Sequence, residues 1–298
     1  MPPFSPSAVF TEWGLPPVLF VLVVWVSGLY LLGAWRLHQR GDRWPAGRTV
    51  AFVFGGMGSF FFATSSGIAA YDDTLLSVHM VQHMILTMVV PLFCALGAPV
   101  TLALRTLPRR PRRWLLALLH SRIAKVLTFP PLTLALYVIS PWALYFSGWY
   151  DATLHSDFLH ELMHLHLVVV GALFLTPILG IDPVPGRVSH PFRLLMLLLT
   201  LPFHAFLGVT IMGQSALIGG SWYPSLHASM PWLPDPHTDQ HLAGGILWAS
   251  GDLIGVLLFA VLFAQWVRAS AQEARREDRR LDRLERLEST SRGTEPNR

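Results

Sequence analysis

Four histidines form two pairs with a spacing of four residues, near the starts of two apolar segments. His79 and His83 lie in VHMVQHM, and His160 and His164 lie in LHELMHL. One turn of helix places residues four apart on the same face. Imidazole is costly to bury in hydrocarbon and is the commonest metal ligand in proteins. The two pairs therefore predict a metal or cofactor site, and the alternative is a set of histidines that only hydrogen-bond one another.

The segments that carry these pairs belong to a strongly apolar chain. It has 298 residues, of which 52% are apolar and 13% are charged, whereas soluble domains carry about 25% charged residues. We expect an all-α polytopic membrane protein, a seven-transmembrane-helix bundle over residues 1–267, followed by a charged helical tail over residues 268–298. The seven predicted spans are 15–35, 50–70, 75–104, 123–146, 159–179, 192–218 and 240–267.

The basic residues predict how the bundle is oriented. Lys and Arg occur between segments one and two, three and four, and five and six, and after segment seven. The N-terminal residues and the other loops contain acidic residues but no Lys or Arg. The positive-inside rule then predicts an N-terminus outside and a cytoplasmic C-terminus. The net charge of +4 reflects this topology and does not indicate nucleic-acid binding.

With this orientation, both histidine pairs lie near the outer boundary of the membrane. Asp239 and His241 open the last segment on the same side, and Asp239 is also a natural N-cap. Met80, Met84 and Met88 repeat every four residues. Imidazole and thioether together suit copper, particularly Cu(I), although methionines also fill cores. The lone Cys94, without a C-x-x-C motif, provides neither a thiolate trap nor a disulfide.

Two further polar residues lie deeper in the last two segments. His204 and Asp252 are each well inside their segments, and consecutive antiparallel helices usually touch. A buried carboxylate needs a partner. We therefore predict that these side chains face each other near mid-membrane, as a structural pair or as a relay for protons or metal.

Two other functional classes fit the histidines. The sequence HELMH at 160–164 matches the zinc-protease signature, in which Glu161 would be the general base. Such an enzyme also needs a third ligand and a route for water and substrate. Alternatively, one histidine from each pair could bind a b-type haem between two helices.

Several of these segments together resemble a known family. HMVQHMILTMVVPLFCALGAPVTLALR, HELMHLHLVVVGALFLTPILGIDP, HAFLGVTIMGQSALIGGSWYP and DQHLAGGILWASGDL are similar to the multi-spanning CtaG-type assembly factors of bacterial caa-type cytochrome c oxidase. The resemblance covers about residues 15–267. Its most specific parts are the helix-three H-x-x-x-H with the following G-A-P break, the GxDP after segment five and the DQ-x-x-A-G start of segment seven.

The resemblance implies a non-catalytic assembly factor of the bacterial plasma membrane, whose partners are the lipid bilayer and a cytochrome c oxidase subunit. It implies copper as the metal, while zinc and haem remain alternatives, and Glu161 keeps the zinc alternative open. Self-association through the tail is a further option. The metal ligands that we carry over are His79, His83, His160, His164, Asp239 and His241.

Overall fold

The computed structural model describes residues 2–183, 185 and 188–293. Across these residues the chain is helical and contains no strand. Arg187, which contributes to the predicted orientation, and the last five residues of the predicted tail, 294–298, lie outside the described residues.

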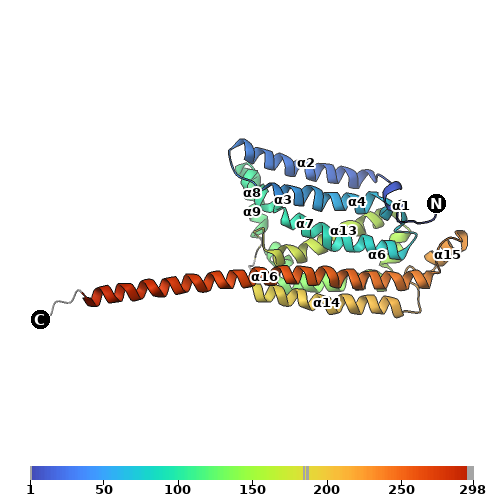
Figure 1. Ribbon diagram of the computed structural model, residues 1–298. Coiled ribbons are helices and arrows are strands. Elements are labelled where there is room, and N and C mark those ends of the chain that lie inside the picture. Colours follow the sequence, from blue (N-terminus) through green and yellow to red (C-terminus); the bar gives the residue numbers. More distant parts are fainter. Residues whose placement is uncertain (1, 184, 186–187, 294–298) are drawn as a thin grey trace.

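The helices form a bundle, and different short helices lie at its two ends (Figure 1). Helices α1, α6 and α15 lie at one end, and α8 and α9 lie at the other. Their bounds, with two π-helical stretches η1 and η2, are α1 (Ala8–Thr11), α2 (Pro17–Gln39), α3 (Ala46–Val50), η1 (Ala51–Gly58), α4 (Ser59–Ser65), α5 (Gly67–Tyr71), α6 (Leu76–Met84), η2 (Ile85–Val89), α7 (Val90–Leu96), α8 (Pro99–Thr106), α9 (Arg109–Leu119), α10 (Arg122–Leu127), α11 (Pro130–Phe146), α12 (Trp149–Leu154), α13 (Asp157–Leu179), α14 (His190–Gly213), α15 (Trp222–Ser229) and α16 (Pro236–Gly293).

Six helical runs in the described chain are long and apolar enough to cross a membrane. They are Pro17–Gln39, Ala46–Tyr71, Leu76–Thr106, Asp157–Leu179, His190–Gly213 and Pro236–Arg283. Length and hydropathy therefore support six of the seven predicted spans, and the membrane character and helical class are confirmed.

The remaining predicted span, 123–146, is divided into two helices. α10 ends at Leu127 and α11 begins at Pro130. Two successive prolines suit the first turn of a helix but cannot continue an earlier one, because they lack the N–H donor. α11 is left with 17 residues, which is short beside the roughly 20 that a crossing helix needs.

The predicted span 192–218 extends too far, because α14 ends at Gly213. The side chain of Gln240, at the start of α16, holds the residues that follow. Its Oε1 accepts from the Ile218 N–H at 2.8 Å, and its Nε2 donates to the Ala216 carbonyl at 3.2 Å. The glutamine of the DQ-x-x-A-G motif thus fixes the non-helical connection after α14.

The GxDP and GAP motifs meet at the opposite end of the bundle. Asp182, just after α13, accepts hydrogen bonds from the backbone N–H groups of Val100 at 3.0 Å and Thr101 at 2.8 Å. These are free donors in the first turn of α8. Ala98 precedes α8 in the left-handed conformation, with φ of 51°. A carboxylate from one membrane segment therefore caps the broken end of another.

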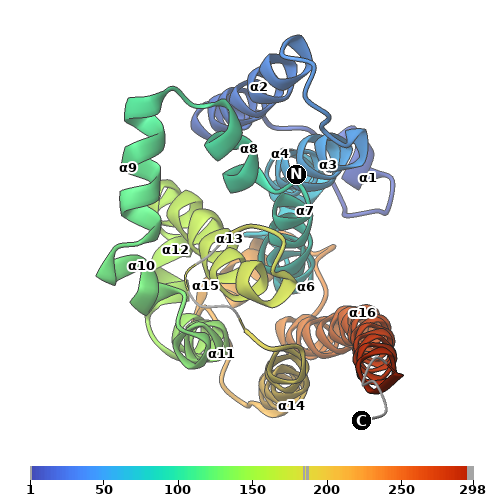
Figure 2. The ribbon, with the colours of Figure 1, turned by 90° about the vertical axis from the view of Figure 1, so that its left-hand side faces the viewer.

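Glycines let the longest helices approach closely. α14 and α16 lie side by side (Figures 1 and 2). A Cβ on Gly208 would lie 2.6 Å from the Gly244 carbonyl oxygen, and one on Gly244 would lie 2.5 Å from that of Gly208. Small residues at such crossings are typical of membrane helices, where contact between backbones replaces the hydrophobic driving force. α16 then continues far beyond the bundle (Figure 1).

A similar contact places α13 against the third membrane segment. Pro91 has no N–H, so it cannot donate to the carbonyl of Thr87 one turn earlier, and the π-helical stretch η2 lies at this point. Gly171 of α13 packs against that carbonyl, and a Cβ there would overlap it and lie 2.8 Å from Cγ of Pro91. The close approach of α13 depends on the missing side chain.

We predict that Gly171→Ala destabilises the protein by about 1–3 kcal/mol, because overpacking a tight contact costs roughly this much. Its Tm in detergent, measured by loss of the monodisperse elution peak after heating, should fall by several degrees. Gly245→Ala is the matched control, since a Cβ there meets nothing within 4 Å. Equal Tm values for the two variants would contradict this account of the contact.

Candidate metal centre

The two histidine pairs are positioned by the starts of α6 and α13. The Ser156 side chain caps α13 by accepting from the Leu159 N–H at 3.5 Å. α6 is capped from another helix, because Asp239 of α16 accepts from the Ser77 N–H at 3.3 Å. His79, His83 and His164 are buried, and His160 is partly buried. The structure brings all four predicted histidines into one region but divides them between two hydrogen-bonded groups.

The first group is built around a carboxylate. Asp72 lies in the turn between α5 and α6, and its Oδ2 is 2.9 Å from Nε2 of His160 and 3.4 Å from Nε2 of His164. One donor atom from each of these three residues lies within 4.8 Å of the others. The centre therefore consists of two imidazole nitrogens and one carboxylate oxygen, a donor set that suits Zn²⁺ or Cu²⁺.

Gln82 orients one of these imidazoles. Its Nε2 donates to the Ala63 carbonyl at 2.9 Å, so its Oε1 faces Nε2 of His164 at 3.0 Å. An amide oxygen only accepts, so His164 carries its proton on Nε2. Nδ1 of His164 is buried and has no hydrogen-bond partner in the described chain. A metal at Nε2 would displace this proton, because a metal binds only an unprotonated nitrogen.

The charge of the centre depends on the protonation of two neighbouring carboxyl groups, Asp72 and Asp73. Burial alone would raise the pKa of Asp72, but hydrogen bonds and attraction from His160 and His164 outweigh burial and hold it well below its usual range. Burial and the neighbouring Asp72 carboxylate raise the pKa of Asp73. Of the two neighbouring carboxylates, Asp72 is therefore the one that provides the negative charge of the centre.

A cavity of about 400 Å³ leads to this centre. Its walls include Asp72, His160 and His164 together with the acidic residues Asp157 and Glu161. The side chain of His160 is 15% exposed, so the centre is reached from the surface without opening the bundle. An acidic entrance raises the local concentration of cations.

The second group is built around a phenol. Tyr145 Oη lies 3.1 Å from Nε2 of His79 and 2.8 Å from Nδ1 of His83. A phenol has one proton to donate, so one of the two imidazoles must donate to it. Nδ1 of His79 is buried and, within the described chain, unpaired.

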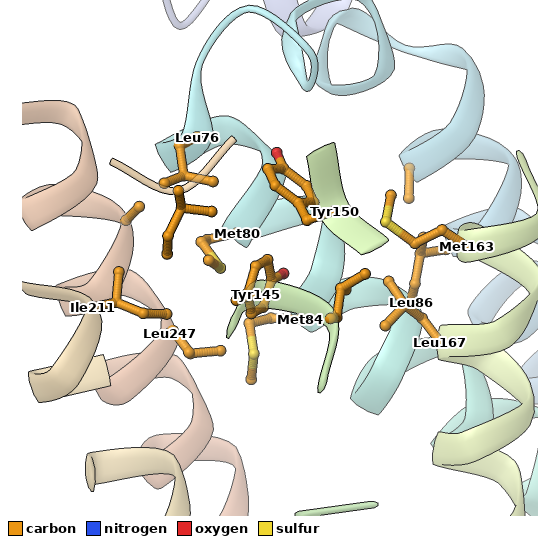
Figure 3. Packing of buried hydrophobic residues seen from close by; sticks show 14 of the residues in the cluster. Leu76, Met80, Met84, Leu86, Tyr145, Tyr150, Met163, Leu167, Ile211 and Leu247 are labelled. Carbon is orange, nitrogen blue, oxygen red and sulfur yellow. The ribbon is translucent and has the colours of Figure 1, made fainter. Parts of the chain in front are cut away.

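This phenol group is enclosed by the core. The His79 ring lies 4.8 Å from that of Tyr150, whose hydroxyl is 2.6 Å from the hydroxyl of Tyr223. Burial raises the pKa of Tyr150 and of Tyr223 well above its usual value, so both phenols stay neutral. Figure 3 shows Tyr145 and Tyr150 packed among Leu76, Met80, Met84 and Met163.

The other predicted ligands lie in different surroundings. Asp239 is buried, but its carboxylate caps α6, and His241 is exposed on α16. Met80 and Met84 belong to the hydrophobic cluster with Ile211 and Leu247 (Figure 3). The methionines are thus packing residues of the core.

His204 and Asp252 do not form the predicted pair. Asp252 Oδ2 accepts from the Trp248 indole N–H at 2.8 Å, one turn earlier in α16. Nδ1 of His204 is 3.1 Å from the Thr200 carbonyl of its own helix. Gly251 packs on the His204 ring, so the two helices do touch at this level. Partners one turn away were available to both residues, and the described chain contains no hydrogen bond between them.

Asp72 and Tyr145 are two central residues of the site that the sequence patterns did not predict. Asp72 was counted only as a charge in an outer loop, although its position directly before the segment of His79 was a usable signal. Tyr145 lies near the C-terminal end of the predicted span 123–146, and nothing in its spacing links it to the histidines.

The fold and the site define a polytopic membrane protein with a buried carboxylate–imidazole centre close to one end of the bundle. Residues 28–269 match the family described as cytochrome c oxidase caa3 assembly factor (Caa3_CtaG). The chain belongs to this family, and the resemblance seen in its motifs is confirmed.

Mycobacterial proteins are among its relatives. The uncharacterized proteins Mb0105 of Mycobacterium bovis and MT0111 of Mycobacterium tuberculosis are each 39% identical to it over 283 residues, which is 93% of this chain and 42% of each relative. The uncharacterized protein ML1998 of Mycobacterium leprae is 36% identical over 289 residues, 94% of this chain and 43% of its own. The chain thus spans less than half the length of these relatives. No solved structure matches it significantly.

We predict that Tyr145→Phe destabilises the protein by about 1–3 kcal/mol, because it leaves buried imidazole nitrogens without a partner. Thermal unfolding in detergent measures the effect. Tyr137→Phe is the matched control, since the Tyr137 hydroxyl is buried and unpaired in the described chain, and its removal should be neutral or stabilising. A Tyr145→Phe protein as stable as wild type would show that the phenol does not hold His79 and His83.

Proposed function

We propose that this protein assists the assembly of haem-copper cytochrome c oxidase by receiving copper at Asp72, His160 and His164. The observation that carries the proposal is the convergence of these three donor atoms at the end of a cavity with an acidic entrance. Copper is cargo in this account, to be passed to an oxidase subunit in the same membrane. Membership of the assembly-factor family favours this non-catalytic role.

The donor set favours Cu²⁺ over Cu⁺. Two imidazoles and a carboxylate are suited to Cu²⁺ or Zn²⁺, whereas Cu⁺ prefers thiolate and thioether ligands. Met80 and Met84 are packed in the core, and Cys94 lies against glycine Gly56 near the other end of its segment. The phenol group of His79, Tyr145 and His83 lies beside the centre, since the ring of His79 is 6.5 Å from that of His160.

The proposal includes a topology. α11 would be the seventh crossing, the end with the metal centre would face outward, and the membrane would be the bacterial plasma membrane. The grouping of basic residues supports this orientation, since Arg40 donates to the Arg105 carbonyl and Arg105 pairs with Asp42 at 3.6 Å, at the end far from the centre. Copper would then enter from the outer side.

A specific observation supports a second candidate, metal-dependent hydrolysis. Glu161 lines the same cavity as the three donors, and Asp72 provides the third ligand that the zinc-protease reading of HELMH requires. In such enzymes the metal activates a water molecule and a carboxylate takes its proton. Glu161 is the residue on which the two candidates differ.

The copper proposal is tested by metal content at a buffered concentration of free Cu²⁺. Wild-type protein should hold close to one copper per chain, and Asp72→Asn should weaken binding at least about tenfold, because it removes the anionic ligand. His241→Ala is the matched control, as it removes an exposed histidine outside the centre. Equal copper in the Asp72→Asn and wild-type proteins, with both eluting as folded species, would refute the proposed site. Preferential retention of Zn²⁺ would support the hydrolase.

The two candidates are separated by Glu161→Gln in cells that lack the native copy. An assembly factor should keep most of its oxidase, measured by the haem a absorbance and cytochrome c oxidation of the membranes. If the protein is a hydrolase, its activity should fall by about 10²-fold or more, because the substitution removes the general base. His164→Ala should damage both functions and shows that the assay responds to the centre. Loss of oxidase in the Glu161→Gln cells would overturn the non-catalytic role.

A further inference from the structure

α9 and α10 form a separate element at the end of the bundle opposite the metal centre. α9 (Arg109–Leu119) and α10 (Arg122–Leu127) contain no buried residue, so neither helix is enclosed by the rest of the protein. In Figure 2, α9 is seen from the side while α14 and α16 are seen end-on. α9 therefore lies across the direction of the membrane-spanning helices, as a helix at a membrane surface does.

This element carries two kinds of exposed side chain, apolar and cationic. Trp114 is 74% exposed and Ile123 is 70% exposed, and Leu118 and Val126 are also exposed. Exposed aromatic and aliphatic residues at this density are unfavourable in water. Four arginines precede the apolar run within α9: Arg109, Arg110, Arg112 and Arg113. In the part of the chain that the structure describes, none of the four forms a salt bridge.

A cavity of about 510 Å³ lies beneath the two helices. It is lined by the apolar side chains of Leu104, Leu116, Leu119 and Phe129, and by the polar side chains of His120 and Lys125. Lys125 is likewise without a salt bridge in the described chain. An apolar cavity beside a cation is complementary to a molecule with a hydrocarbon chain and an anionic head.

We propose that α9, α10 and this cavity bind an anionic phospholipid. The exposed apolar residues enter the acyl region, the arginines and Lys125 contact the phosphate, and the cavity receives part of one acyl chain. Amphipathic helices with arginine on the polar side and tryptophan on the other bind membranes in this way, and basic clusters next to membrane helices recruit anionic lipids. The proposal does not depend on the metal centre, and it accounts for a feature that copper handling leaves unexplained.

Native mass spectrometry of the full chain in detergent tests this proposal with phosphatidylglycerol and phosphatidylcholine. Phosphatidylglycerol should bind at least about tenfold more tightly. Changing Arg109, Arg110, Arg112 and Arg113 together to Gln should remove most of this preference, since each cation near a lipid surface contributes. The matched control changes four arginines of the α16 tail to Gln: Arg275, Arg276, Arg279 and Arg280. It removes the same charge at a different place and should keep the preference.

Two results would overturn the proposal. Equal binding of the two lipids by the wild-type protein would show an unspecific apolar surface. Equal loss of the preference in the α9 variant and the tail variant would show an effect of net charge alone.

The double variant Trp114→Ser with Leu118→Ser tests the apolar residues. It should weaken the binding of both lipids while leaving the ratio of their affinities close to that of wild type. If that double variant bound lipid as wild type does, the apolar face would not contact lipid. Elution of each variant as a monodisperse peak shows whether the bundle is intact.

Discussion

The buried carboxylate of Asp72 is the interaction on which this end of the bundle depends. An isolated carboxylate in such a place would be strongly unfavourable, and here two imidazoles from α13 offset the cost. The same contacts fix the α5–α6 turn against α13, and Gln82 extends them to the Ala63 carbonyl of α4. Three membrane segments are thus held in register by one anion. Removing only one partner would leave the others buried and unpaired, which costs more than the pair contributes.

The rest of the bundle is held by a different means. In hydrocarbon, apolar side chains gain little by leaving lipid for protein, so packing and polar joints decide which helices meet. Close backbone contacts at Gly171, and between Gly208 and Gly244, provide the packing. The helix caps from Asp182 and Asp239 provide the polar joints. Both caps reach between segments distant in sequence. In this chain, the aspartates of the GxDP and DQ-x-x-A-G motifs therefore both serve joints between helices.

Patterns within one helix could be predicted from the sequence, whereas contacts between elements could not. The spacing of four placed each histidine pair on one face, and hydropathy placed six spans. The partner of α13 is a turn residue, Asp72, and no periodicity relates a turn to a distant helix. Asp239 illustrates the same limit, because a residue of N-cap type at a helix start was predicted to serve its own helix and caps α6 instead. His204 and Asp252 were paired by depth alone, although Trp248 was a nearer donor for Asp252.

The geometry of the centre also bears on how firmly it would hold an ion. Here Nε2 of His160 hydrogen-bonds Asp72 Oδ2, and Nε2 of His164 hydrogen-bonds Gln82 and lies 3.4 Å from the same Asp72 oxygen. Binding must break these bonds and release a proton, which lowers the net affinity. Release then restores them, so that the empty centre is itself stable. Under the proposed function, this self-satisfied arrangement suits a protein that must give its cargo away, and the cavity with an acidic entrance gives the ion a route to the centre.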